Sequence, residues 1–119
     1  MEIEASAREI VAVLRRCRLR VGNESAMQIS IGQALTDGGI EHEREHRLSA
    51  ADRIDFMIGS VGLEAKTRCN KRAIFRQLQR YSEHDAIEAL ILVTGTAIGL
   101  PAAINGKPIY LVATGRAAL

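Results

Sequence analysis

The feature that most constrains the fold is a nearly unbroken apolar run at residues 86–94, Ala-Ile-Glu-Ala-Leu-Ile-Leu-Val-Thr. A short run of this kind, without polar alternation, is typical of a strand that is buried on both faces. The chain has 119 residues, of which 47% are apolar and 3% aromatic, which suffices for one domain with an aliphatic core. We therefore expect a single α/β domain.

Helical and extended patterns precede and follow this run. Apolar stripes with helical spacing predict helices over residues 2–16 and 23–37, the second capped by Asn23. The charged segment 40–48 fits an exposed strand. A turn around Asn105-Gly106 precedes a final strand at 109–114.

A hairpin occupies the middle of the chain. Residues 53–58 and 61–67 flank Gly59-Ser60, a glycine-first connection that is favoured between antiparallel strands. A helix capped by Asn70 and reaching about Tyr81 then leads to the apolar run. A crossover of this length predicts that the run lies parallel to the second hairpin strand.

Charged side chains are expected to converge within this hairpin. Alternation places Asp55 opposite the face of Ile54 and Phe56, and it places Glu64 and Lys66 on one face of the next strand. If the register brings these faces together, two carboxylates and an ammonium group meet. Hard oxygen ligands of this kind suit Mg²⁺ or Mn²⁺. The alternative is a cross-strand salt bridge without a catalytic role.

Polar residues also interrupt the apolar stripes of two helices. Glu24 shares a stripe with Met27 and Ile31, and Gln77 shares one with Leu78. An unpaired carboxylate on such a face is costly, which favours a metal or cation partner for Glu24.

A basic patch follows the hairpin. Residues 65–82 contain no acid and six basic side chains: Lys66, Arg68, Lys71, Arg72, Arg76 and Arg80. This patch could follow a phosphate backbone. The alternative is a solvated helix face whose long side chains cover apolar surface.

The hairpin residues resemble a known signature. Asp55, followed after eight residues by Glu64-Ala65-Lys66, resembles the motif of the PD-(D/E)XK nuclease superfamily. The order of elements is also similar: a helix with a glutamate, a strand with the aspartate, a strand with Glu-x-Lys, then a helix and a buried strand. Gln77-x-x-x-Tyr81 further resembles a motif of RecB-type nuclease domains. The resemblance spans about residues 23–94 and departs from the pattern in that no proline precedes Asp55.

The resemblance implies a restriction-endonuclease-like mixed β-sheet flanked by helices, and metal-dependent phosphodiester hydrolysis. Mg²⁺ or Mn²⁺ would be held by Glu24, Asp55, Glu64 and the carbonyl of Ala65. Lys66 would orient the attacking water and stabilise charge on the phosphorane. Gln77 would position Lys66, a water or DNA.

The resemblance also implies a DNA partner. We expect an endonuclease, with branched or junction DNA as one candidate substrate, acting as a homodimer and without an organic cofactor. Residues expected to contact the nucleic acid are Arg68, Lys71, Arg72, Arg76, Arg80 and Tyr81. The N-terminus lacks the pattern of a secretory signal and no segment approaches the length of a membrane span. We therefore expect a cytosolic protein with no membrane partner, and a phage gene is one source that fits.

Other chemical motifs are weaker. His42 and His46 would lie about 13 Å apart on a strand, which favours contact with solvent or DNA over metal ligation. Cys17 and Cys69 have no zinc-ligand spacing and are expected to be reduced and buried. The segment 95–99 lacks the Lys-Ser/Thr of a phosphate loop.

Two alternatives to a nuclease remain at this point. The first is a nucleic-acid-binding module that keeps the fold and the basic patch without cutting. The second is an oligomeric structural or assembly protein, for which neither metal nor DNA affinity is expected.

Overall fold

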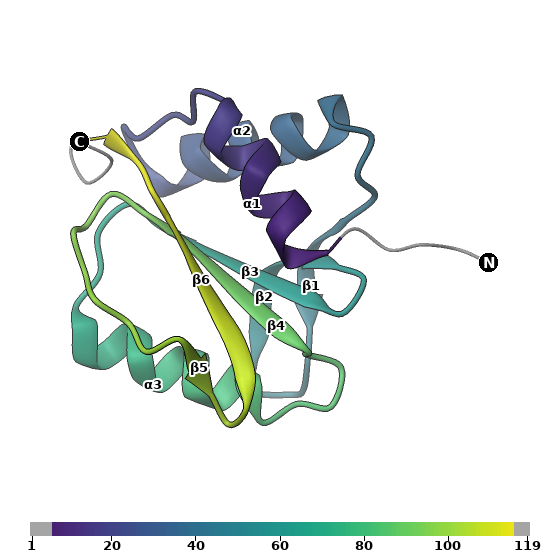
Figure 1. The fold of residues 1–119 in the computed structure, drawn as a ribbon, viewed down its shortest axis with the longest axis vertical. Coiled ribbons are helices and arrows are strands. Elements are labelled where there is room, and N and C mark those ends of the chain that lie inside the picture. The colour runs from purple at the N-terminus through teal and green to yellow at the C-terminus, as the bar shows by residue number, and fades with distance from the viewer. Residues whose placement is uncertain (1–5, 116–119) are drawn as a thin grey trace.

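A computed structural model describes residues 6–115, and its strands form one mixed sheet with helices on both sides (Figure 1). The elements of the described residues are α1 (Ala7–Arg16), α2 (Glu24–Asp37), β1 (Glu43–Arg47), β2 (Arg53–Ile58), β3 (Val61–Lys66), α3 (Lys71–Ser82), β4 (Ala89–Thr94), β5 (Ala103–Ile104) and β6 (Lys107–Ala113). The strand order is β1-β2-β3-β4-β6-β5. Strands β3, β4 and β6 run parallel to one another, and the remaining neighbours are antiparallel. The predicted α/β class is therefore confirmed.

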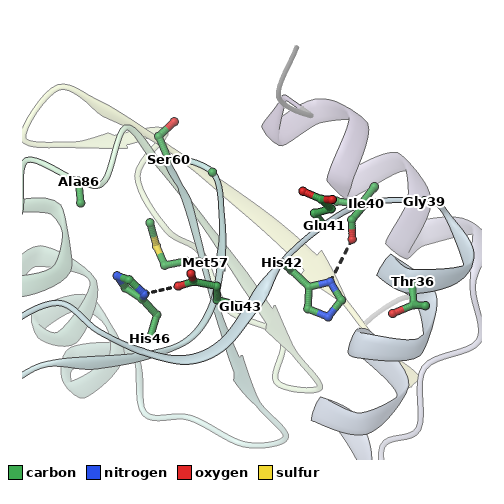
Figure 2. Close-up of a pocket in the computed structure, with 11 residues that line it drawn as sticks. Thr36, Gly39, Ile40, Glu41, His42, Glu43, His46, Met57, Ser60 and Ala86 are labelled. Atoms are coloured by element: carbon green, nitrogen blue, oxygen red, sulfur yellow. Dashed lines mark hydrogen bonds and ion pairs between the residues drawn. The ribbon is translucent and has the colours of Figure 1, made fainter. Parts of the chain in front are cut away.

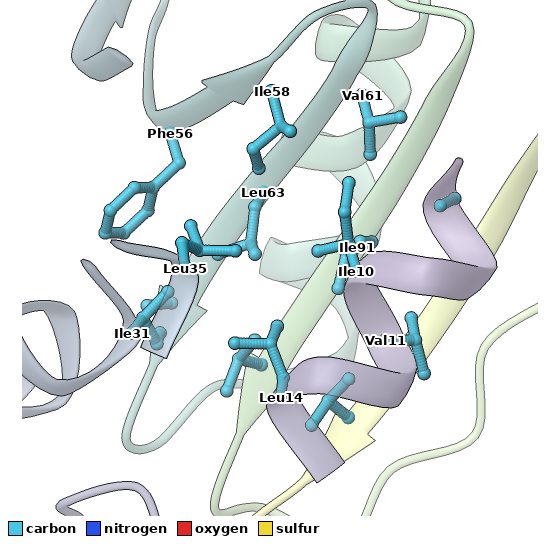
Figure 3. Packing of buried hydrophobic residues seen from close by; sticks show 14 of the residues in the cluster. Ile10, Val11, Leu14, Ile31, Leu35, Phe56, Ile58, Val61, Leu63 and Ile91 are labelled. Carbon is cyan, nitrogen blue, oxygen red and sulfur yellow. The ribbon is translucent and has the colours of Figure 1, made fainter. Parts of the chain in front are cut away.

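The two faces of the sheet are covered by different helices. On one face, Ile10 of α1 and Ile31 of α2 pack against Phe56, Leu63 and Ile91 of the sheet (Figure 3). On the other face, α3 contributes its own buried stripe, consisting of Ile74, Leu78 and Tyr81. All six residues of β4 are buried, as predicted for the apolar run. The strand begins at Ala89 instead of residue 86, because the N–H of Ile87 bonds to the carbonyl of His84 in a turn. The N–H of Glu88 bonds to the carbonyl of Ser60, in the connection between β2 and β3.

Local capping and turn chemistry sets most element boundaries. The side chains of Asn23 and Asn70 accept hydrogen bonds from the N–H groups of Ala26 (2.8 Å) and Ala73 (3.1 Å), as predicted for N-caps. Ser6 caps α1 in the same way, so this helix begins at Ala7. Residues 2–5, which the apolar stripe assigns to the helix, lie outside the described residues.

The turn at Asn105-Gly106 closes a hairpin that the sequence pattern did not predict. Both residues have positive φ angles, 52° and 74°, which is the backbone of a two-residue type I′ connection. The turn pairs β5 with the start of β6, so the last strand begins at Lys107 instead of residue 109.

The parallel strands align their carboxyl ends. Lys66 pairs with Thr94, and Thr94 pairs with Ala113, so β3, β4 and β6 end together at what we call the carboxyl edge. Within residues 6–115, no helix has the length and apolar character needed to cross a membrane.

Gly62 in β3 provides a test of the packing beneath α3. A Cβ atom at this position would lie 2.5 Å from Ile54, 2.8 Å from Ile87 and 3.0 Å from Leu90. We predict that Gly62→Ala lowers the free energy of unfolding by about 1–3 kcal/mol through overpacking. Urea denaturation measures this change.

Gly99→Ala is the matched control, because no atom lies within 4 Å of its would-be Cβ. Equal unfolding midpoints for the two variants would contradict the packing described for β3.

Candidate active site

The strands of the central hairpin separate at Asp55. Backbone pairing between β2 and β3 runs from Ile58↔Val61 to Phe56↔Leu63. Beyond this pair, side-chain carboxylates replace backbone carbonyls as the hydrogen-bond acceptors. The N–H of Asp55 donates to Glu64 Oε1 at 3.2 Å, and the N–H of Ala65 donates to Asp55 Oδ2 at 2.8 Å. Both carboxylates are thereby fixed between the diverging strands.

The simple alternation predicted for β2 is wrong at Ile54. This side chain belongs to the core beneath α3, whereas Phe56 and Ile58 face α1 and α2. Between Ile54 and Phe56, the partner strand carries Glu45 with a φ of 50°, an uncommon backbone conformation for a residue other than glycine. This irregular backbone lies in β1 opposite Asp55, next to the position where the alternation of β2 fails.

Glu64 contacts one residue of α3, Tyr81, which is itself hydrogen-bonded to Gln77. Glu64 is only 2% exposed, and its Oε2 lies 3.3 Å from the hydroxyl of Tyr81. The same hydroxyl lies 3.1 Å from the carbonyl of Arg53 and receives a hydrogen bond of 2.9 Å from Gln77 Nε2. Tyr81 therefore positions Glu64, and Gln77 acts on Glu64 only through Tyr81.

One role differs from what the resemblance implies, and another stays a prediction. The amide of Gln77 donates to Tyr81, but Gln77 also lines the groove that Lys66 lines, so its role towards Lys66, a water or DNA stays a prediction. Tyr81 is not placed to contact nucleic acid, because at 1% exposure its side chain does not reach a surface ligand. As the resemblance implies, both residues lie beside the candidate site, Tyr81 in contact with Glu64 and Gln77 in contact with Tyr81.

Lys66 completes the cluster at the carboxyl edge. Its Nζ lies 3.7 Å from Glu64 Oε2 and 3.5 Å from Glu24 Oε1, at the first turn of α2. The side chain of Lys66 is 31% exposed and that of Glu24 is 42% exposed, so the cluster opens to solvent on this side. The structure thus brings together Glu24, Asp55, Glu64 and Lys66. Ala65 joins this cluster through its N–H, while its side chain is buried in the core beneath α1 and α2.

Burial and mutual repulsion alter the acidity of the carboxyl groups. Burial, followed by the charge of Asp55, raises the pKa of Glu64 to about 8. Burial also raises the pKa of Asp55, against the opposing hydrogen bond from Ala65. Burial lowers the pKa of Lys66, but the surrounding carboxylates, Glu64 foremost, outweigh it and raise that pKa overall. The ammonium group thus stays charged beside a pair of carboxyl groups that resist full ionisation.

The donor set is compatible with Mg²⁺ or Mn²⁺ but is not a complete cage. Within residues 6–115, no three carboxylate, imidazole or thiolate side chains are arranged as a metal-binding group. Mg²⁺ commonly takes only one or two protein carboxylates and keeps several waters. Asp55 and Glu64 supply two hard oxygen ligands of this kind, and two carboxyl groups with raised pKa values would gain from a cation.

A basic groove runs from Lys66 along α3. It has a volume of about 320 Å³, and its charged lining residues are Lys66, Arg68 and Arg80. The basic patch predicts that Arg80 is available to bind phosphate, but its guanidinium group forms an ion pair within the protein. Its Nε lies 3.4 Å from Asp52 Oδ1, while the other oxygen of Asp52 lies 3.0 Å from His84 Nε2. No ion pair within the described residues involves the other basic residues of this surface, Arg68, Lys71, Arg72 and Arg76.

The Asp52–His84–Arg80 cluster was not predicted. The hydrogen bond from His84, opposed in part by burial and assisted by Arg80, lowers the pKa of Asp52. The residues Asp52 and His84 are 32 positions apart, so no local spacing in the sequence indicates their contact.

A larger hollow lies at the opposite end of the strands (Figure 2). It has a volume of about 1010 Å³ and is lined in part by His42, Glu43 and His46. His46 Nδ1 bonds to Glu43 at 2.5 Å, and His42 Nδ1 bonds to the carbonyl of Ile40 at 3.0 Å. The two imidazoles thus have separate partners, and this hollow does not contain the residues of the predicted chemistry.

The predicted burial of the cysteines is wrong. Cys17 is exposed at the end of α1, and Cys69 is half-buried. Both are free thiols, and Cys69 Sγ lies 3.6 Å from the hydroxyl of Thr94.

Comparison with protein-family models, curated proteins and solved structures found no match for this chain.

The raised pKa of Glu64 predicts a pH-dependent stability of the metal-free protein. The pKa of this group rises from 4.5 to about 8 on folding, so between these values the folded state binds more protons than the unfolded state. The free energy of unfolding should therefore fall as the pH rises from 5 to 8, by an amount on the order of a few kcal/mol. Urea titrations at the two pH values measure the difference.

Glu64→Gln should remove most of this pH dependence, because the amide does not titrate. The exposed Glu41→Gln should preserve it. If Glu64→Gln shows the same pH dependence as the unsubstituted chain, Glu64 is not the responsible group.

Proposed function

We propose that this protein is a metal-dependent DNA endonuclease of the PD-(D/E)XK type, with a restriction-endonuclease-like fold. The observation that carries the proposal is the pair of carboxylates, Asp55 and Glu64, held between separating strands beside Lys66. The order of elements gives further support, because α2, β2, β3, α3 and β4 come in the order that the resemblance implies, with β1 between α2 and β2.

Asp55 and Glu64 would hold the cation, with the carboxylate of Glu24 and the carbonyl of Ala65 nearby. When bound, Mg²⁺ or Mn²⁺ would lower the pKa of a coordinated water and stabilise negative charge on the phosphate. Lys66 is charged and partly exposed, so its ammonium group can donate to a phosphate oxygen or orient the attacking water. The burial of Glu64 and its contact with Tyr81 keep the carboxylate in one orientation.

The basic groove along α3 supports a nucleic-acid substrate. The exposed side chains of Arg68, Lys71, Arg72 and Arg76 lie beyond Lys66 without acidic partners among the described residues. Such a surface binds phosphate backbones with little dependence on sequence. The homodimer and the cytosolic location that the sequence implies stay predictions.

A second candidate is a nucleic-acid-binding module without cleavage. It is favoured by the ion pairs of Lys66 with Glu24 and Glu64, which satisfy the cluster internally. Metal-independent DNA binding with no turnover would support it.

The first test is DNA cleavage with Mg²⁺ or Mn²⁺ on duplex, branched and single-stranded substrates. We predict that Lys66→Ala lowers the cleavage rate by about 10²-fold or more, because the variant lacks the cation beside the reacting phosphate. Lys71→Ala is the control: it removes an exposed lysine of the same surface and should affect affinity only. Undiminished cleavage by Lys66→Ala would contradict the proposal. So would the absence of cleavage of all three substrates by the unsubstituted protein.

The second test concerns the support beneath Glu64. Tyr81→Phe removes the hydroxyl that contacts the carboxylate, so we predict a loss of about 10-fold or more in Mn²⁺ affinity or in activity. Calorimetric titration of Mn²⁺ measures the affinity.

The matched control is Tyr110→Phe, since Tyr110 is the only other tyrosine in the sequence and is half-buried in β6. If both variants bind Mn²⁺ as tightly as the unsubstituted protein, Tyr81 does not position a metal ligand.

A further inference from the structure

The connection between α1 and α2 carries a second concentration of positive charge. Residues 10–23 contain no acid and four arginines: Arg15, Arg16, Arg18 and Arg20. All four are exposed, and none forms an ion pair within the described residues. Among residues 6–115, these guanidinium groups make one hydrogen bond, from Arg15 to the carbonyl of Leu111 at 3.0 Å. We call these four residues the arginine connection.

The arginine connection lies at the same edge of the sheet as the candidate active site. The N–H of Arg20 bonds to Ser30 Oγ at 3.0 Å, which fixes the connection against α2. The side chain of Val21 lies beside Gly115, two residues after the end of β6. Three residues later, Glu24 contacts Lys66. The chain therefore passes from the arginines into the active-site cluster.

This surface and the α3 groove belong to opposite faces of the sheet. The helices α1 and α2 cover one face, and α3 covers the other (Figure 1). Arg68 precedes α3, and Lys71 and Arg72 are its first two residues. Several acids gather at the other end of the strands, where Glu41 and Glu43 line the hollow of Figure 2 and Glu88 bonds to Ser60. A polyanion is accordingly attracted to the carboxyl edge from both sides.

Two basic surfaces separated by the sheet match a ligand with two phosphate backbones. A duplex presents two phosphate backbones that face in different directions, and it carries one charge per about 1.7 Å of its axis, twice the density of either strand alone. The two strands of a duplex, or two arms of a branched molecule, can therefore reach both surfaces at once.

We propose that the arginine connection is a second phosphate-binding surface, which makes double-stranded DNA the preferred substrate class. This inference rests on the proposed DNA substrate but not on catalysis. Its residues are separate from Asp55, Glu64 and Lys66, so binding and cleavage can be tested independently.

The experiment measures binding of the full chain to a fluorescent duplex and to one of its single strands, without divalent metal. Arg18→Glu should weaken duplex binding at least fivefold and single-strand binding less than twofold. The slope of log affinity against log salt should become shallower by about one for each phosphate that the variant no longer neutralises. Arg8→Glu is the matched control, because it reverses an exposed arginine of α1 far from the carboxyl edge. Arg72→Glu should weaken binding to both DNAs.

Thermal unfolding of each variant checks that the fold is kept, and Arg18→Gln provides a milder change at the same position. If Arg18→Glu and Arg8→Glu bind duplex within twofold of each other, the second surface is overturned while the α3 groove and the catalytic proposal still stand. Binding to polyglutamate is measured in parallel. If Arg18→Glu weakens binding to polyglutamate but not to duplex DNA, the proposal is also overturned, in favour of an acidic protein partner. Absence of DNA binding by the unsubstituted chain would overturn the proposed function itself.

Discussion

The arrangement of the site depends on two hydrogen bonds that replace the sheet ladder where β2 and β3 separate. Asp55 accepts the N–H of Ala65, and Glu64 accepts the N–H of Asp55. These bonds satisfy backbone groups that the separating strands would otherwise leave unpaired. They also place two acidic side chains in a poorly solvated gap. The raised pKa values and the approach of Lys66 follow from that single geometric fact.

The surrounding layers make this costly arrangement persist. Burial of Glu64 is compensated by Tyr81, which is itself fixed by Gln77 and by packing within the core beneath α3. Lys66 supplies the opposite charge, and Glu24 extends the ion-pair cluster to α2. Helices from both faces of the sheet thus contribute to one polar network, which couples the order of the site to the packing of the whole domain.

Charge is distributed along the strand direction in a way that suits an anionic ligand. Exposed arginines lie at the carboxyl edge on both sides of the sheet, while Glu41, Glu43 and Glu88 lie near the opposite end. One exception is Arg80, whose pairing with Asp52 removes it from the freely available cations. A net charge of +2 conceals this separation, because acids and bases nearly cancel over the whole chain.

Local structure is what the chain encodes most directly: the caps at Asn23 and Asn70, the glycine-first hairpin and the fully buried strand β4. These features depend on interactions within a few residues or on hydrophobic periodicity, so they are visible along the sequence. The meeting of Asp55, Glu64 and Lys66 was predictable because a short hairpin fixes its own register. Tertiary packing alone sets the separation of the strands, the turn of Ile54 towards α3, the contact of Tyr81 with Glu64 and the pairing of Asp52 with His84. Each of these depends on how layers distant in sequence pack together, and no spacing of residues encodes that packing.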